Sequence, residues 1–209
     1  MSKLEELKKS KIVAVIRGAR SDQILPIAHA LLSGGVSTFE ITVETPKVCL
    51  LIEKVKDEFG NQAIVGAGTV LDPETARAVI MSGAEFIFSP IVNAETIKMA
   101  KRYGVLSIPG ALTPTEILTA YENGGDLIKV FPADVMGVSY FKSLQGPLSH
   151  IPLMPTGGMD VGNIQDYLKA GAVAAGVGSS LVNAKNLNSD EDYLKLTEKA
   201  KQFSESAIF

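Results

Sequence analysis

Several residue types that define other protein classes are scarce in this chain. Its 209 residues include no tryptophan, one cysteine and two histidines. The single cysteine, Cys49, excludes an internal disulfide and is compatible with a reducing compartment. His29 and His150 have no metal-ligand spacing with a partner, so no metal site is expected. The formal net charge of −3 gives no reason to expect binding to nucleic acid.

Long hydrophobic runs are also missing. No apolar stretch is long enough to cross a bilayer. Residues 1–11 carry charge throughout, unlike a secretory signal peptide. We therefore expect a soluble cytoplasmic protein, with neither a membrane nor a nucleic acid as partner.

What the chain does have is a rhythm of eight short apolar runs separated by longer amphipathic stretches. The runs cover residues 12–16, 38–43, 63–69, 85–89, 105–109, 127–131, 153–156 and 173–176. Thr45-Pro46, Asp72-Pro73 and Thr113-Pro114 each place a capping side chain before a proline, which predicts helix starts. The predicted helices stop at glycines, namely Gly34, Gly60, Gly83, Gly104, Gly124 and Gly171.

This rhythm predicts parallel strands joined by helical crossovers. Eight units in 209 residues fit a single α/β domain over residues 1–209, a closed (β/α)8 TIM barrel. Residues 3–9 add an extra N-terminal helix and residues 190–203 form the last one. The alternative is an open doubly wound sheet, but no Gly-x-Gly-x-x-Gly opens the first crossover.

Lys129 lies inside one of the buried strands, at residues 127–131. Strand alternation turns Ile128 and Val130 toward the helices and Lys129 into the barrel. Burial disfavours an ammonium, so the pKa of Lys129 should fall, and the free amine can form a Schiff base with a ketone. The alternatives are a lysine that reaches water at the strand end and one that pairs with a carboxylate.

Glu40 is the carboxylate that alternation directs toward Lys129. Phe39, Ile41 and Val43 share the apolar face of their strand, which leaves Glu40 pointing inward. The two residues therefore form either a catalytic pair or a structural buried ion pair, and such ion pairs are weak sources of stability. Chemistry in this kind of barrel gathers at the carboxyl ends of the strands.

Two glycine-rich segments follow the last two strands. Gly157 and Gly158 come after one strand, and Gly178 and Ser179 after the next. Glycines let the backbone approach an anion, and the loops after strands seven and eight are the usual phosphate site of TIM barrels. These four residues are our predicted phosphate site, although ordinary turn glycines would look the same.

The order and spacing of these motifs resemble a known family, the class I 2-keto-3-deoxy-6-phosphogluconate (KDPG) and 4-hydroxy-2-oxoglutarate (KHG) aldolases. The resemblance runs from about residue 11 to residue 182. The motifs are VAVIR (13–17), GGVSTFEITVETP (34–46), IVGAGTV (64–70), FIFSP (86–90), IPGALTPTE (108–116), IKVFPAD (128–134), MPTGG (154–158) and GVGSSLV (176–182).

The resemblance implies a (β/α)8 barrel, a homotrimer and an enzyme that needs no metal or other cofactor. It implies that Lys129 forms the Schiff base and that Glu40 is the general acid/base. Thr69 and Pro90 match positions at the pyruvyl end of the substrate, and Thr156 belongs to the segment at the phosphate end.

Two positions depart from the family pattern. Some members carry a substrate-contacting arginine where this chain has Glu44, and Ile91 replaces a glycine common after the Ser-Pro pair. Arg17 ends the first strand, and our hypothesis is that it supplies the carboxylate-binding charge instead.

The resemblance implies cleavage of a KDPG-like substrate to pyruvate and glyceraldehyde 3-phosphate in the Entner-Doudoroff pathway. The galactonate isomer and 4-hydroxy-2-oxoglutarate stay open as substrates. The rival readings are a phosphate-binding isomerase or epimerase without an imine and a non-catalytic barrel that binds a sugar phosphate.

Overall fold

The computed structural model describes residues 2–208, in which helices and strands alternate along the chain. The strands are β1 (Ile12–Ile16), β2 (Thr38–Thr42), β3 (Ile64–Gly68), β4 (Phe86–Phe88), β5 (Leu106–Ile108), β6 (Gly110–Ala111), β7 (Ile128–Val130), β8 (Leu153–Pro155) and β9 (Ala175–Val177). The α-helices are α1 (Lys3–Ser10), α2 (Ile24–Ser33), α3 (Val48–Phe59), α4 (Pro73–Met81), α5 (Ala94–Arg102), α6 (Pro114–Glu122), α7 (Ala133–Leu144), α8 (Ile164–Lys169) and α9 (Asp190–Ser206). Short 3-10 helices are η1 (Gly60–Gln62) and η2 (Ala184–Asn186).

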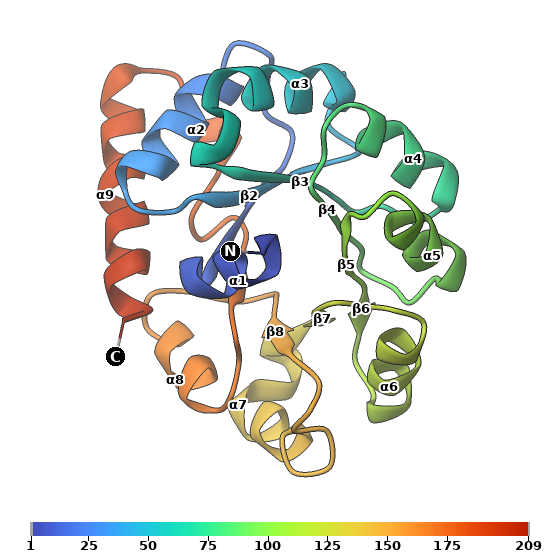
Figure 1. The fold of residues 1–209 in the computed structure, drawn as a ribbon. Coiled ribbons are helices and arrows are strands. Elements are labelled where there is room, and N and C mark those ends of the chain that lie inside the picture. Colours follow the sequence, from blue (N-terminus) through green and yellow to red (C-terminus); the bar gives the residue numbers. More distant parts are fainter. Residues whose placement is uncertain (1, 209) are drawn as a thin grey trace.

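The strands form a curled, parallel arrangement with α2 to α9 on its outer side (Figure 1). One sheet has the order β5-β4-β3-β2-β1-β9 and the other the order β6-β7-β8, and every pairing within them is parallel. A single residue, Pro109, separates β5 from β6. A proline has no N–H for a sheet hydrogen bond, so it interrupts the strand at this point. A parallel bridge from Thr156 to Gly176 links the end of β8 to β9. The fold is therefore α/β with a curled parallel sheet, as the strand-helix rhythm predicted.

Two apolar layers hold this arrangement together. The outer layer lies between strands and helices and includes Ile128 and Val130 of β7. The inner layer fills the hollow of the sheet with Phe86, Ile108 and Leu127, among others. Neighbouring residues of one strand thus belong to different layers, which is what a period of two along a strand requires.

Helix α1 lies across the middle of the ring of strands in Figure 1. Leu7 from this helix is fully buried and belongs to the inner layer. Burying a leucine side chain contributes about 1.5–3 kcal/mol. Lys3 of α1 also forms an ion pair with Glu85, just before β4. Helix α1 therefore covers the amino-terminal end of the inner layer.

Two of the three predicted helix starts are confirmed. Asp72 caps α4 by accepting a hydrogen bond from Thr75 N at 2.6 Å, and Thr113 caps α6 in a capping box with Glu116. The prediction at Thr45 is wrong, because α3 begins at Val48. The Thr45 hydroxyl instead accepts a hydrogen bond from Gly18 N at 3.0 Å and holds the loop after β1.

The predicted glycine stops are confirmed at all six positions, and at five of them the glycine has a positive φ. Gly34 has φ −86°, and Gly35 takes the left-handed conformation with φ 86°. Gly34 faces α9 instead, where an added Cβ would lie 2.6 Å from the carbonyl oxygen of Thr197. Helices α2 and α9 lie side by side at this point, at one edge of the molecule in Figure 1.

Replacing Gly34 with alanine should weaken this contact without backbone strain, since its φ is ordinary. We expect Gly34→Ala to lower the free energy of unfolding by about 1–3 kcal/mol, the usual cost of overpacking. Urea unfolding followed by circular dichroism measures this change. Gly146→Ala is the control, because its Cβ would meet only the carbonyl oxygen of Ser143, at 3.8 Å. Equal unfolding midpoints for the two variants would contradict the close packing of α2 on α9.

Candidate active site

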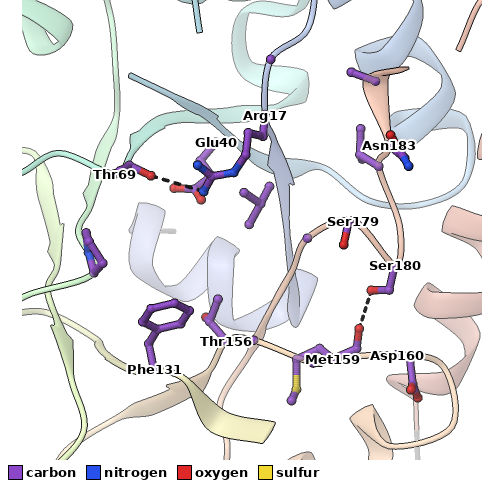
Figure 2. A pocket seen from close by; sticks show the side chains of 18 of the residues that line it. Arg17, Glu40, Thr69, Phe131, Thr156, Met159, Asp160, Ser179, Ser180 and Asn183 are labelled. Carbon is purple, nitrogen blue, oxygen red and sulfur yellow. Dashed lines mark hydrogen bonds between the residues drawn. The ribbon is translucent and has the colours of Figure 1, made fainter. Parts of the chain in front are cut away.

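A cavity of about 920 Å³ opens at the carboxyl ends of the strands (Figure 2). Ten residues were predicted from the sequence to belong to the site, and all ten line this one cavity. They are Arg17, Glu40, Thr69, Pro90, Lys129, Thr156, Gly157, Gly158, Gly178 and Ser179. They come from different strands and from the loops that follow them, so only the curled sheet brings them together.

Lys129 lies in β7 with 7% of its surface exposed. Its Nζ is 4.1 Å from the centroid of the Phe88 ring and 4.6 Å from that of Phe131. Burial lowers the pKa of Lys129 to about 8, the negative charge of Glu40 opposes this fall, and the positive charge of Arg17 adds to it. The aromatic rings attract an ammonium by about 0.5–2 kcal/mol, which restores only part of its lost hydration. A free amine is therefore accessible near neutral pH.

Glu40 lies in β2 and is 2% exposed. Burial raises the pKa of its carboxyl to about 8, and the positive charges of Lys129 and Arg17 oppose this rise. Within residues 2–208, Glu40 Oε2 has no hydrogen-bond partner. The neighbouring strand makes room for this carboxyl, because a Cβ on Gly68 of β3 would overlap it. An unpaired buried oxygen is costly unless a ligand or water joins it.

The two groups face the same cavity without direct contact. Among the described residues, no ion pair of 4.0 Å or less joins Lys129 to Glu40. This disfavours the structural ion pair that the sequence left open, and it leaves space between amine and carboxyl. Because both groups titrate near pH 8, each is present in both protonation states there and can exchange protons with a bound molecule.

Arg17 and Thr69 lie at one side of the cavity. Arg17 forms an ion pair with Glu44, and its Nη2 donates a hydrogen bond to Thr69 Oγ1 at 3.5 Å. Thr69 has a left-handed backbone with φ 59°, which is rare for a β-branched residue. Such strain costs about 1–3 kcal/mol and is concentrated at functional sites.

The glycine loops form the opposite side of the cavity, where Figure 2 shows Ser179 and Ser180. Gly157 and Gly158 both have positive φ, at 97° and 67°. Ser180 donates a hydrogen bond from its hydroxyl to the carbonyl of Met159, which ties the two loops to each other. Within residues 2–208, the backbone N–H groups of Gly158 and Ser179 donate no hydrogen bond. Unpaired N–H groups of this kind suit an anion.

Other kinds of site receive no support from the described part of the chain. Residues 2–208 hold no group of three or more histidine, cysteine, aspartate or glutamate side chains able to bind a metal ion. Over the same residues, the helices are too short or too polar to traverse a lipid bilayer.

A family model described as "KDPG and KHG aldolase" matches residues 4–198. The chain belongs to the KDPG and KHG aldolase family. This confirms the resemblance read from the motifs, and it makes the protein a lyase.

Individual relatives agree with this assignment. A KHG/KDPG aldolase of Escherichia coli K12 is 35% identical over 94% of this chain and 92% of its own. A 2-dehydro-3-deoxy-6-phosphogalactonate aldolase of the same organism is also 35% identical, over 84% and 86% of the two chains. The crystal structure of a Legionella pneumophila KDPG aldolase, with pyruvate captured as a covalent carbinolamine, superposes with a TM-score of 0.88. That structure is 26% identical and covers 96% of this chain and 97% of its own.

Phe88, Gly68 and Lys185 are among the residues that shape the site without having been singled out from the sequence. Phe88 was detectable, since alternation turns it inward with Phe86 next to the Ser-Pro pair. Gly68 was visible only as part of a motif, because its role depends on a side chain of the neighbouring strand. Lys185 lines the cavity as well, and its place in a long irregular segment gave no signal.

The coupling between Glu40 and Lys129 can be tested through the reactivity of the amine. Glu40→Gln removes the charge that holds the pKa of Lys129 up, so this pKa should fall below about 8. About half of the amine is already unprotonated at pH 8, so the variant amine should react at most about twofold faster there. Competitive acetylation over a pH series, read by peptide mass spectrometry, measures both pKa values.

Asp160→Asn is the matched control, because Asp160 also lines the cavity but does not shift the pKa of Lys129. A Lys129 titration that Glu40→Gln leaves unchanged would show that the two groups do not interact.

Proposed function

We propose that this enzyme is a class I aldolase that reversibly cleaves 2-keto-3-deoxy-6-phosphogluconate to pyruvate and glyceraldehyde 3-phosphate. The observation that carries the proposal is the pairing of a desolvated amine with a desolvated carboxyl across one cavity, in a chain of the KDPG and KHG aldolase family. An isomerase or a binding protein needs no lysine that is deprotonated near neutral pH.

In the proposed reaction, Lys129 Nζ adds to the C2 carbonyl of the substrate and forms a carbinolamine. Loss of water gives an iminium, which accepts the electron pair of the C3–C4 bond as that bond breaks. Glu40 takes the proton of the C4 hydroxyl, through water, as the aldehyde leaves. The resulting enamine is protonated at C3, and water then releases pyruvate and restores the amine.

The two sides of the cavity suit the two ends of this substrate. Arg17 and Thr69 are proposed to bind the carboxylate next to the reacting ketone, with Pro90 beside them. The glycine loops, Thr156 and Ser179 are proposed to hold the phosphate, which fixes the reacting carbons against Lys129. Thr156 Oγ1 is buried and without a hydrogen-bond partner among residues 2–208, so a bound substrate would give it one.

The galactonate isomer is the second candidate substrate, because the E. coli galactonate and gluconate relatives are equally similar to this chain, at 35% identity. The substrates differ at one carbon, so steady-state rates with both isomers decide between them. 4-Hydroxy-2-oxoglutarate, cleaved to pyruvate and glyoxylate, is a further candidate, supported by the name of the E. coli KHG/KDPG relative.

The same proposal includes the finer features expected from the sequence. We infer one domain over residues 1–209 that closes as a (β/α)8 barrel with α1 as an extra helix. The Thr156–Gly176 bridge and the single residue between β5 and β6 support closure. A homotrimer and a cytoplasmic location remain part of the proposal, on the grounds of the family resemblance and the single cysteine.

Imine formation is tested by trapping. Incubation with pyruvate and borohydride should add one reduced pyruvyl group to Lys129, because hydride converts the imine to a stable amine. Lys129→Met should lose the adduct and reduce turnover by about 10³-fold or more, while keeping the volume of the side chain. Intact-protein mass spectrometry with peptide mapping reads both results.

Lys98→Met is the control, since Lys98 is an exposed lysine on α5 paired with Glu95. It should trap pyruvate as well as the unmodified enzyme. An unlabelled Lys129 in folded protein would refute the imine mechanism and favour an isomerase or a binding protein.

The assignment of Arg17 makes a separate prediction. Arg17→Ala should raise the Kd for pyruvate about 10-fold or more, because a charge-assisted hydrogen bond to the carboxylate is lost. The concentration dependence of pyruvate trapping gives this Kd. Arg20→Ala is the control, because Arg20 is a nearby arginine that pairs with Asp22. Unchanged pyruvate affinity in Arg17→Ala would remove Arg17 from the substrate site.

A further inference from the structure

We propose that Lys185 is a specificity residue that binds the phosphate of the substrate and distinguishes phosphorylated from unphosphorylated keto-deoxy acids. This inference rests on the proposed function and extends it to a side chain outside the glycine loops. The argument depends on where Lys185 lies, on what holds it there and on the charges around it.

Lys185 belongs to η2, in the segment that runs from β9 to α9. It is exposed and lines the cavity, together with Gly178, Ser179 and Asn183 of the same segment. Figure 2 shows Ser179 and Asn183 on the side of the cavity away from Thr69. Lys185 is therefore on the side of the predicted phosphate site, and its long side chain has freedom to reach a bound anion.

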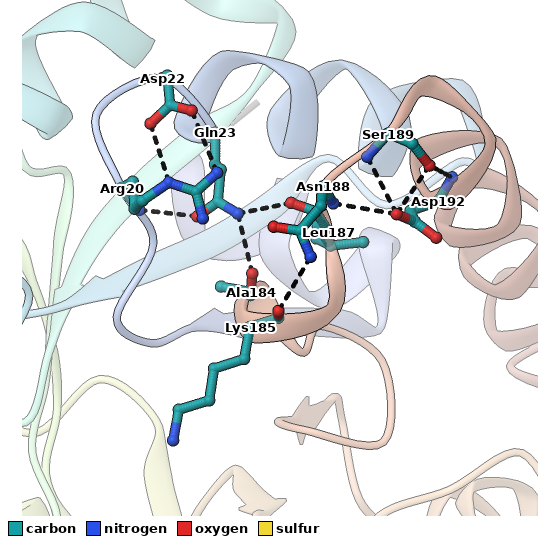
Figure 3. Close-up of polar contacts among 9 residues, drawn as sticks. All are labelled: Arg20, Asp22, Gln23, Ala184, Lys185, Leu187, Asn188, Ser189 and Asp192. Atoms are coloured by element: carbon teal, nitrogen blue, oxygen red, sulfur yellow. Dashed lines mark hydrogen bonds and ion pairs between the residues drawn. The ribbon is translucent and has the colours of Figure 1, made fainter.

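The backbone around Lys185 is fixed by hydrogen bonds (Figure 3). Gln23 is 1% exposed, and its Nε2 donates to the carbonyls of Ala184 at 2.9 Å and Leu187 at 2.6 Å. The backbone N–H of Arg20 donates to Gln23 Oε1 at 2.9 Å, which fixes the orientation of the amide. Asn188 Nδ2 donates to the carbonyl of Lys185 itself at 3.2 Å.

This arrangement places Lys185 on a rigid base. Ala184 and Leu187 are buried on either side of it, and the buried amide of Gln23 satisfies both of their carbonyls. The side chain of Lys185 extends away from this cluster in Figure 3. Because the backbone is already fixed, only the side chain of Lys185 has to be ordered when it binds an anion, which limits the entropy lost.

Charge distinguishes Lys185 from the other cations of the cavity. Of the described residues, Arg17, Lys129 and Lys185 are the cations that line it. Arg17 pairs with Glu44, and Lys129 is buried with a lowered pKa. Within residues 2–208, Lys185 forms no ion pair. It is thus the cation on this side of the cavity whose charge is not already neutralised.

A phosphate near pH 7 carries close to two negative charges, whereas the backbone N–H groups of the glycine loops carry only partial positive charge. One full positive charge from Lys185 balances part of that excess. A lysine also suits a phosphate as a mobile point charge, without the planar fork that a carboxylate prefers.

The test compares Lys185→Ala with the unmodified enzyme on 2-keto-3-deoxy-6-phosphogluconate and on 2-keto-3-deoxygluconate, which lacks the phosphate. Lys185→Ala should raise KM for the phosphorylated substrate about 5- to 30-fold and leave kcat within about twofold, as expected for one lost charge-assisted hydrogen bond. KM and kcat for 2-keto-3-deoxygluconate should not change. Lys185→Arg should restore KM to within about threefold.

Lys199→Ala is the matched control, because it removes the same charge from an exposed lysine on α9 outside the cavity. It should leave both KM values unchanged. Equal KM values for Lys185→Ala and the unmodified enzyme on the phosphorylated substrate would overturn the proposal, as would an equal rise of KM on both substrates.

Two further measurements separate this proposal from the proposed function. Pyruvate has no phosphate, so Lys185→Ala should form the borohydride-trapped adduct as the unmodified enzyme does. Inorganic phosphate should shift the amide resonances of Gly158 and Ser179, with a Kd about 5- to 30-fold weaker in Lys185→Ala.

These measurements distinguish a failure of the proposed aldolase function from a failure of the Lys185 proposal. If the unmodified enzyme forms no pyruvyl adduct, the aldolase function is refuted. The Kd for inorganic phosphate then still tests whether Lys185 binds a phosphate. Normal trapping with an unchanged phosphate Kd in Lys185→Ala refutes Lys185 alone.

Gln23 acts through Lys185 as a positioning residue, and a double-mutant cycle tests this. Gln23→Leu should raise KM for the phosphorylated substrate with little change in kcat. Combined with Lys185→Ala, it should add no further rise in KM. A general loss of structure would instead lower kcat and pyruvate trapping in both backgrounds, which would contradict a positioning role.

Discussion

The structure depends on keeping an amine and a carboxyl out of water in the same cavity without letting them neutralise each other in a direct ion pair. An isolated buried charge costs several kcal/mol, and a protein group usually responds by shifting its pKa. Lys129 and Glu40 both respond in this way: burial lowers the pKa of Lys129 to about 8 and raises the pKa of Glu40 to about 8. Phe88 excludes water from the amine, and Gly68 leaves the volume that the carboxyl occupies.

The packing of the curled sheet compensates for the burial of these two polar groups. Alternate residues of β7 face two different apolar layers, so Ile128 and Val130 anchor the strand in the outer layer while Lys129 faces inward. Leu7 of α1 packs into the other end of the inner layer. Water therefore approaches the amine from the carboxyl ends of the strands, the side on which the cavity opens. The large outer layer compensates for the unfavourable burial of two polar groups in the hollow.

Those parts of the molecule that follow from local periodicity were predictable from the sequence. The run 12–16 matches β1 residue for residue, and alternation placed Glu40 and Lys129 on the inner face. Predictions failed where a distant contact outweighed a local signal. Thr45 resembles a helix cap, but its hydroxyl binds the loop after β1. Gln23 and the carbonyl it holds are 161 residues apart, so no local pattern could place Lys185 at the cavity.

The distribution of charge between the two sides of the cavity agrees with the chemistry proposed for Lys129. An iminium on Lys129 is cationic, so the positive charge of Arg17, which already lowers the pKa of the amine, would oppose it as well. The carboxylate of a keto acid would offset that opposition, and so does Glu44, which is paired with Arg17. In the proposed arrangement, a phosphate would lie farther from the reacting carbons, and its binding would not need a neutralised cation. An unpaired cation is therefore harmless on that side of the cavity and disadvantageous next to the imine, which is the arrangement that Lys185 and the Arg17–Glu44 pair display.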